Sequence, residues 1–259
     1  MEEIPEALSR ILQKVNTRDL SQNRQTFQEK STKQGSYKCP ICQDTGFIYN
    51  KETDTYRQCK HVALEVTKSK WRKLGIDPEK SNQTFSNFKV WNETSKTSKA
   101  AAIKYYNEFK EIKDTRKNSI MFCGQVGSGK THLSIALALN FIKKGINVVY
   151  MPYRDVVTRI KQNMLDKEYY KKQLSKFQLA DILLIDDLFK GKVNETDINI
   201  MFEVVNYRYL NYLPLIVSSE FTLDKMLNFD EGVGSRIYEM CKGHIVQIEG
   251  KENNYRLKE

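Results

Sequence analysis

The sequence predicts an α/β fold in which helices cover both faces of a parallel sheet. From residue 119 onward, short apolar runs alternate with stretches long enough to form crossover helices. The first of these runs ends in a glycine-rich loop that opens a helical stretch, and this strand, loop and helix arrangement suits phosphate binding. A cluster of cysteines at residues 39–59 precedes this region and indicates a small separate module.

Five apolar runs provide the predicted strands. Each run is short and nearly continuous in apolar residues, which is typical of parallel strands that are buried on both faces. They occupy residues 119–123, 147–151, 181–186, 214–218 and 244–248. The sequence therefore predicts a five-stranded parallel sheet.

The part of the chain before the sheet has a different pattern. Apolar residues recur at helical spacing from Ile4 to Val15, which predicts an amphipathic helix within residues 1–30. Its apolar stripe packs either on its own domain or on another protein. A polar stretch, Asn92 to Lys99, then separates the cysteine module from a predicted helix at Ala100–Ile112. We divide the chain into an N-terminal region (1–75) containing the cysteine module (37–62), a linker and helical lead-in (76–118) and a main domain (119–259).

The chain is basic, and the excess charge is uneven. It has 42 Lys/Arg against 32 Asp/Glu, a net charge of +10, of which residues 1–118 contribute +8. This balance favours anionic partners such as nucleic acid, but a solvated lysine-rich surface gives the same count. No apolar run approaches the roughly 18 residues of a membrane helix, and the first residues lack a signal pattern. We expect a cytoplasmic protein with no membrane partner.

Residues 124–131 read G-x-x-x-x-G-K-T, a motif that binds nucleotide phosphates. The glycines let backbone N–H groups curl around phosphate oxygens, while Lys130 neutralises the β and γ charge. The Thr131 hydroxyl is the expected Mg²⁺ ligand, and the N-terminus of the next helix completes the anion site. We therefore expect ATP and Mg²⁺ as cofactors. The expected nucleotide contacts are Gly124, Gln125, Val126, Gly127, Ser128, Gly129, Lys130, Thr131 and His132.

A second acidic element ends the third predicted strand. The run at 182–185 is followed directly by Asp186 and Asp187, as in P-loop nucleotide hydrolases. Asp186 is expected to hold Mg²⁺, and Asp187 to orient or deprotonate the attacking water. The alternative is a pair of solvated turn carboxylates.

The cysteine module has the ligand spacing of a zinc site. Cys39 and Cys42 form one close pair, and Cys59 and His61 form another. An odd total of five cysteines argues against a disulfide framework. We expect these four residues to bind Zn²⁺; the alternative is a reduced CxxC turn with His61 as an ordinary surface histidine. His244 has no ligand partner nearby in the sequence and is expected to be structural.

Residues 152–178 are a basic, aromatic-bearing insertion between the second and third predicted strands. They hold 7 Lys/Arg against 3 acids. Such a segment suits contact with a phosphate backbone and stacking on bases. The alternative is a solvated helix face with core tyrosines. The candidate residues for binding single-stranded DNA are Arg154, Arg159, Lys161, Lys171 and Lys172.

Together these residues resemble the DnaC/DnaI-type replicative helicase loaders of the AAA+ class, including their phage-encoded relatives. The resemblance covers nearly the whole chain and rests on the order and spacing of several short motifs. They are the pair Cys39/Cys42 with 44–46 (DTG), 75–76 (GI), 84–88 (TFSNF), 129–133 (GKTHL), 184–188 (LIDDL), 217–220 (VSSE), 234–236 (GSR) and 254–257 (NYRL).

The resemblance implies an AAA+ P-loop ATPase core behind a small helical, zinc-binding N-terminal domain. It implies a slow ATPase that binds the replicative hexameric DNA helicase and places it on single-stranded DNA during replication initiation. Ser219 resembles a sensor of the γ-phosphate, although Glu220 stands where an Asn is common. Arg236 resembles an arginine finger that completes a neighbouring copy's site, which implies self-association through the ATP site. Arg256 resembles a second sensor arginine, and Asp187 occupies a position where many AAA+ enzymes have Glu.

Three alternative functions share parts of this pattern. A transposition-helper ATPase of the IstB type shares the AAA+ core, but such helpers generally lack the zinc motif. A phage decoy would bind helicase or loader and inhibit replication with an idle ATPase. A small-molecule kinase would share the phosphate loop but would leave the zinc site and Arg236 without a role.

Overall fold

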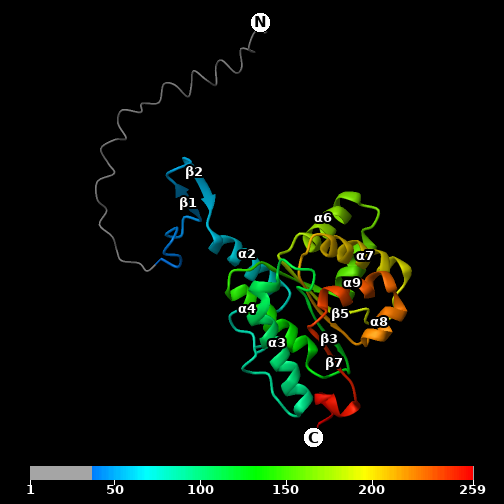
Figure 1. Ribbon diagram of the computed structural model, residues 1–259. Helices are drawn as coiled ribbons and strands as arrows, with labels where there is room; N and C mark the ends of the chain where they lie inside the picture. The colour runs from blue at the N-terminus through cyan, green and yellow to red at the C-terminus, as the bar shows by residue number, and fades with distance from the viewer. Residues whose placement is uncertain (1–36, 259) are drawn as a thin grey trace, which may run out of the picture. The chain divides into compact units, whose positions relative to one another are not determined.

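The computed structural model describes residues 37–258 (Figure 1), and the chain divides into two units, residues 1–45 and 46–259. The amphipathic helix predicted in residues 1–30 lies outside the described residues. In the first unit, residues 37–45 form a tight turn. The backbone N–H of Cys39 donates to Asp44 Oδ1 at 2.9 Å, and the N–H of Gln43 donates to the Cys39 carbonyl at 2.9 Å.

The second unit begins with a hairpin and a helix. Strands β1 (Phe47–Asn50) and β2 (Thr55–Gln58) pair antiparallel, and α2 (Lys60–Lys73) follows. The indole N–H of Trp71 donates to the Val148 carbonyl at 2.8 Å, and the indole stacks on Tyr150 with ring centroids 5.3 Å apart. Helix α2 is therefore packed on the edge of the main sheet, although it falls within the region 1–75.

The main sheet has five parallel strands, as the apolar runs predict. The strands are β3 (Ile120–Gly124), β4 (Val148–Pro152), β5 (Ile182–Leu188), β6 (Leu215–Ser219) and β7 (Ile245–Ile248). Their order across the sheet is β4-β5-β6-β3-β7. Strands β3 and β5 are neighbours of β6, so the chain segments that follow them meet at one edge of the sheet. This edge holds the candidate site.

Helices cover both faces of this sheet, as Figure 1 shows. Even-numbered strand residues such as Phe122 and Leu184 pack in one apolar cluster, and odd-numbered residues such as Met121 and Leu183 pack in the other. Helices α2, α3 (Glu93–Ile112) and α4 (Lys130–Lys143) contribute to the first cluster. The second is formed with α5 (Tyr153–Gln162), α6 (Lys167–Gln178), α7 (Glu195–Leu210), α8 (Leu223–Phe229) and α9 (Glu231–Cys241).

Helix α3 begins seven residues earlier than the sequence pattern suggests. The expectation of a polar, non-helical stretch at Asn92–Lys99 is wrong, because Asn92 caps a helix that starts at Glu93. The Asn92 side chain accepts from the Ser95 N–H at 2.8 Å, and Ser95 Oγ accepts from the Asn92 N–H at 3.1 Å. This reciprocal capping box makes a polar sequence helical without an apolar stripe at its start.

A buried arginine joins three elements on the other face. Arg208 of α7 has an exposed fraction of 0%, and its guanidinium donates to the carbonyls of Phe177, Gln178, Ala180 and Pro214 at 2.7–3.0 Å. These carbonyls end α6 and precede β5 and β6. Arg208 thereby holds the basic insertion against the sheet. Within the described residues, no helix is long and apolar enough to cross a membrane.

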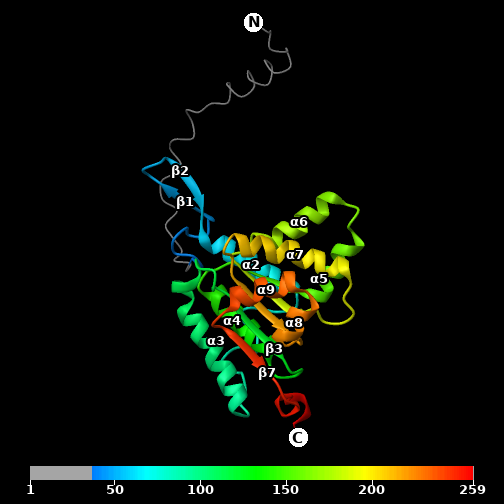
Figure 2. The same cartoon turned by 45° about the vertical axis from the view of Figure 1, so that its right-hand side comes forward.

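The C-terminal segment returns to the glycine-rich loop. Two short 3₁₀ turns, η1 (Lys251–Asn253) and η2 (Tyr255–Leu257), follow β7 (Figure 2). The Tyr255 N–H donates to the Gly127 carbonyl at 3.0 Å, and Asn92 Nδ2 donates to Asn253 Oδ1 at 2.7 Å. Residues far apart in the sequence therefore meet beside the loop.

Candidate functional site

The glycine-rich loop connects β3 to α4 in a conformation that side chains would disrupt. Gly124, Gly127 and Gly129 have φ angles of 99°, 73° and 88°. A Cβ at Gly124 would lie 2.1 Å from the Ile248 carbonyl oxygen, and one at Gly127 would lie 2.0 Å from Asn254 Oδ1. The loop therefore requires glycine both for its backbone and for its close neighbours. It leads into the N-terminus of α4, where unpaired backbone N–H groups favour an anion.

Lys130 lies in the first turn of α4 and is buried. Its ammonium donates to the carbonyls of Gly124 at 2.9 Å and Gln125 at 2.6 Å, while Ser128 Oγ also donates to Gln125. Burial lowers the pKa of Lys130, and the carboxylates of Glu220 and Asp187 oppose this shift. The ammonium thus lies against the loop where phosphate oxygens would bind.

Thr131 and Asp186 meet across the site although 55 residues separate them. Thr131 Oγ1 donates to Asp186 Oδ1 at 2.9 Å, the Tyr150 hydroxyl donates to Asp186 Oδ2 at 3.0 Å, and Ser218 Oγ donates to Asp186 Oδ1. A hydroxyl and a carboxylate at this spacing are the hard oxygen ligands that Mg²⁺ prefers, so the two residues fit that ion. Sequence reasoning missed Tyr150 and Ser218, because their contacts depend on the pairing of β4, β5 and β6.

Asp187 takes part in a charged group that the motifs did not indicate. Lys190 Nζ lies 2.8 Å from Asp187 Oδ2 and 3.0 Å from Glu220 Oε1. These hydrogen bonds raise the pKa of Lys190, with Asp187 as the larger contribution. All three residues line the same cleft as Lys130.

The VSSE segment at the end of β6 places its three polar residues differently. Ser218 contacts Asp186, as described above, and Glu220 lines the cleft. Ser219 is buried, and its hydroxyl donates to the Leu188 carbonyl at 2.8 Å. The role of Ser219 as a γ-phosphate sensor stays a prediction, and within the described residues its hydroxyl does not line the cleft.

The cleft around the loop has a volume of ≈ 570 Å³ and an aromatic wall. The rings of Trp91 and Tyr255 lie 4.9 Å apart between centroids, and those of Phe88 and Trp91 lie 5.8 Å apart. Phe88 covers Gly129 so closely that a Cβ there would lie 2.7 Å from the ring. Arg256 also lines the cleft. A pocket with a phosphate-binding loop on one side and flat rings on another suits a nucleotide.

His132 connects this aromatic wall to the loop helix. Its Nε2 lies 2.8 Å from the Thr84 carbonyl oxygen, and its ring meets the Phe88 ring edge-on, with centroids 5.3 Å apart. His132 also lines the cleft. It therefore fixes the TFSNF segment beside the phosphate loop.

Arg236 lies on α9 and does not line the described cleft. Its Nε donates to Asn206 Oδ1 at 2.9 Å, and its Nη1 donates to the Gly232 carbonyl at 2.7 Å. The guanidinium also lies 4.8 Å from the centroid of the Phe202 ring. The side chain is thus held on the α7–α9 surface and is partly buried.

The basic insertion forms helices α5 and α6. Arg154, Arg159, Lys171 and Lys172 are exposed on them. Lys161 differs, because its ammonium lies 2.6 Å from Asp197 Oδ1, a carboxylate that is almost fully buried. Four of the five candidate DNA contacts are therefore open to solvent, and Lys161 also secures α5 to α7.

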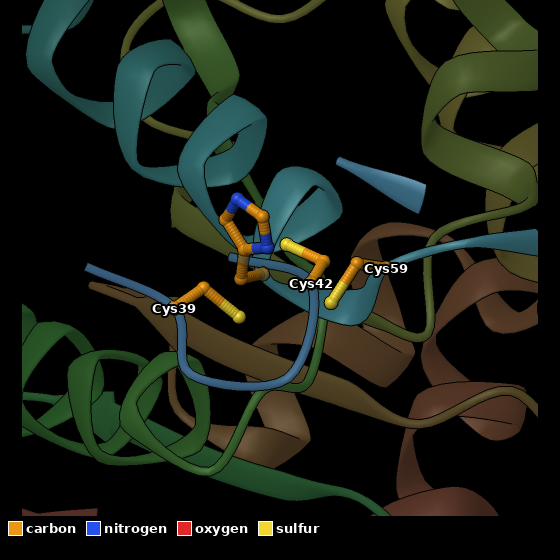
Figure 3. A group of neighbouring side chains, drawn as sticks. Cys39, Cys42 and Cys59 are labelled. Carbon is orange, nitrogen blue, oxygen red and sulfur yellow. The ribbon is translucent and has the colours of Figure 1, made fainter. Parts of the chain in front are cut away.

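The predicted zinc ligands lie together. One donor atom from each of Cys39, Cys42, Cys59 and His61 lies within 4.8 Å of the others. Figure 3 shows the three cysteine side chains converging. The cysteines are buried and His61 is partly buried. Three thiolates and one imidazole at this spacing are a donor set that fits tetrahedral Zn²⁺.

Comparison with known proteins identifies the family. Residues 76–259 match the family described as IstB-like ATP binding protein. The chain belongs to this IstB-like family. Relatives from Bacillus subtilis include the uncharacterized protein YqaM, 39% identical over 79% of this chain and 68% of YqaM. The phage-like element PBSX protein XkdC is 35% identical over 85% of this chain and 86% of its own length.

Solved structures share the fold of this IstB-like protein. The DnaC helicase loader has a TM-score of 0.57 at 23% identity, covering 65% of this chain and 97% of its own. DnaI has a TM-score of 0.55 at 16% identity, covering 64% and 90%. The predicted resemblance to helicase loaders and phage-element proteins is thereby confirmed. The protein is an AAA+ ATPase with a five-stranded parallel sheet.

Proposed function

We propose that this ATPase is an ATP-dependent loader that binds the replicative hexameric DNA helicase and places it on single-stranded DNA. The observation that carries the proposal is that the nucleotide cleft adjoins the basic helical insertion. Asp186 of β5 pairs with Pro152, the last residue of the adjacent strand β4, and α5 begins at the next residue, Tyr153. The Escherichia coli replicative helicase loader DnaC supports it, with 23% identity over 72% of this chain and 74% of that protein.

In this proposal the cleft binds ATP through its own residues. The loop N–H groups and Lys130 hold the phosphates, and the base lies against Trp91 and Tyr255. Thr131 and Asp186 would hold Mg²⁺, which would supply positive charge to offset the negative charge of the phosphates. Asp187 orients the attacking water, and Arg256 approaches the phosphates from the C-terminal segment.

A second copy of the chain completes the site. Arg236 is held on α9 outside its own cleft, where an arginine can reach the nucleotide of a neighbouring copy. ATP binding would then order adjacent copies through Arg236. The exposed cations of α5 and α6 would follow the DNA backbone, with affinity that falls steeply with salt. The zinc module in the N-terminal region would dock on the helicase.

The first test is co-purification of the protein with its host's replicative helicase, with and without ATP, followed by the native mass of the complex. A stable complex supports the helicase as partner, and deposition of helicase on a circular single-stranded template then distinguishes loading from inhibition by a decoy. Absence of a complex, with ATPase activity intact, would overturn the proposal. Lys130→Ala is expected to lose ATP affinity, and its failure to do so would remove the first step.

The second candidate is a transposition helper, which the family itself favours. The insertion sequence IS21 putative ATP-binding protein of Pseudomonas aeruginosa is 27% identical over 56% of this chain and 54% of that protein. Such a helper would bind DNA and a transposase rather than a helicase. Binding to duplex DNA in preference to single strands, with no helicase complex, would support this candidate.

A further inference from the structure

Lys190 reaches the nucleotide cleft from a loop that carries no recognised motif. Its ammonium bridges the carboxylates of Asp187 and Glu220, and its side chain is 41% exposed. It is therefore one of four Lys/Arg side chains that line this cleft, with Lys89, Lys130 and Arg256. Lys130 is bonded to the carbonyls of its own loop, whereas Lys190 pairs with the two acids that face it.

The backbone that presents Lys190 is unusual. Asp187 and Phe189 both adopt left-handed conformations, with φ angles of 56° and 60°, which side chains other than glycine adopt at a cost. Phe189 is fully buried, with its ring 5.0 Å from that of Phe229 and 5.8 Å from that of Tyr153. This packing fixes the strained turn and directs Lys190 back over Asp187, to whose carbonyl its N–H donates at 3.1 Å.

The negative charges of the cleft suggest a function for the Lys190 ammonium. Besides Asp186, which would hold Mg²⁺, the cleft contains the carboxylates of Asp187 and Glu220, and it is proposed to receive the further negative charge of the terminal phosphate of ATP. Like charges at close range repel, and a cation held between them offsets the repulsion. A nucleoside diphosphate lacks the terminal phosphate, so the Lys190 ammonium contributes much less to its binding.

We propose that Lys190 is the positioning residue that lets this site distinguish a nucleoside triphosphate from a diphosphate. Its ammonium joins the terminal phosphate to Asp187 and Glu220 and keeps Asp187 beside the attacking water. The inference deepens the proposed nucleotide role and rests on it. The resemblance places a sensor of the γ-phosphate at Ser219, and this inference assigns that role to the Lys190–Glu220 pair instead.

The experiment measures the affinities of the full chain for MgATP and MgADP by displacement of a fluorescent nucleotide. Lys190→Met keeps the aliphatic stem and removes the charge. This variant is expected to lower the affinity for MgATP by about five- to tenfold and to change the affinity for MgADP by less than about twofold. Lys190→Arg is expected to restore the preference for MgATP. Lys192→Met is the matched control, since Lys192 is exposed on the same loop and does not line the described cleft.

A double variant tests the charge argument. Adding Glu220→Gln to Lys190→Met removes one of the carboxylates that repel the phosphate, so part of the MgATP affinity is expected to return. Equal loss of MgATP and MgADP affinity in Lys190→Met, or no loss of either, would overturn the inference. Wild-type protein that binds neither nucleotide would instead overturn the proposed nucleotide role. If Lys190→Met fails to fold, Lys190→Gln carries the test, because it also removes the charge and keeps a similar stem. An unchanged ratio of MgATP affinity to MgADP affinity in Lys190→Gln would overturn the inference.

Discussion

Arg208 is a single side chain on which the packing of the basic insertion depends. Burial lowers its pKa to about 9, so the guanidinium is still charged near neutral pH. Its partners are backbone carbonyls at the end of α6 and before β5 and β6. The charge is thereby shared among peptide dipoles, including those at the negative end of α6. A buried charge of this kind ties three elements together through one residue.

Removing this guanidinium is expected to destabilise the fold strongly. Arg208→Met leaves several buried carbonyls without donors, and we expect the free energy of unfolding to fall by about 3 to 5 kcal/mol. Urea denaturation followed by circular dichroism measures the change. Arg154→Met is the control, because Arg154 is exposed and its replacement should cost less than about 0.5 kcal/mol. A loss under about 1 kcal/mol for Arg208→Met would show that water replaces the donor.

At the scale of elements, the strands were predictable and the contacts between them were not. The apolar runs predicted β3 to β7 to within a residue or two because burial on both faces requires continuous apolar sequence. The glycine loop and Asp186 were predictable from local motifs. Lys190 and Tyr150 reach the site through strand order and a strained turn, which no local pattern encodes. The start of α3 was missed because a cap, and not an apolar stripe, sets it.

The cap of α3 gives a prediction of moderate size. Asn92→Ala removes the acceptor for the Ser95 N–H and the link to Asn253, and we expect a loss of about 1 kcal/mol in the free energy of unfolding. Thermal and urea denaturation measure it. Thr97→Ala, an exposed substitution in the next turn of α3, serves as the control. Equal stabilities for the two variants would contradict the assigned role of the cap.

The burial of His244, just before β7, leads us to expect that the free energy of unfolding depends on pH. Burial lowers its pKa, an effect that Glu108 opposes and Lys104 assists. As pH falls below about 6.5, the unfolded chain takes up a proton that the folded chain resists, so stability declines from about pH 6.5 downward through the folded pKa. His244→Phe should flatten this decline. Denaturation of both proteins at a series of pH values tests it, and parallel curves would refute the assignment.

At the scale of the whole molecule, the ATPase core and the zinc module are stabilised by different interactions. Residues 46–259 contain two large apolar clusters of their own. The cysteine module (37–62) contributes no residue to either cluster, and a module of this size depends on a metal for its stability. The two parts should therefore respond differently when metal is removed.

Metal removal is expected to separate the two parts functionally. We expect one zinc per chain by elemental analysis, and Cys42→Ser should lower this content. A chelator should leave MgATP affinity unchanged while it abolishes helicase binding. Magnesium is restored after chelation so that the nucleotide assay is not affected. Zinc content at background in freshly purified protein would contradict the assignment.

The two tryptophans of the chain occupy very different surroundings. Trp71 of α2 is packed against β4, with 1% of its surface exposed. Trp91 stands in the aromatic wall of the cleft, beside Tyr255. The fluorescence of Trp71 should stay constant, while that of Trp91 should change when a nucleotide binds in the cleft. A Trp71→Phe protein would therefore report its own occupancy optically, in real time and without an attached dye.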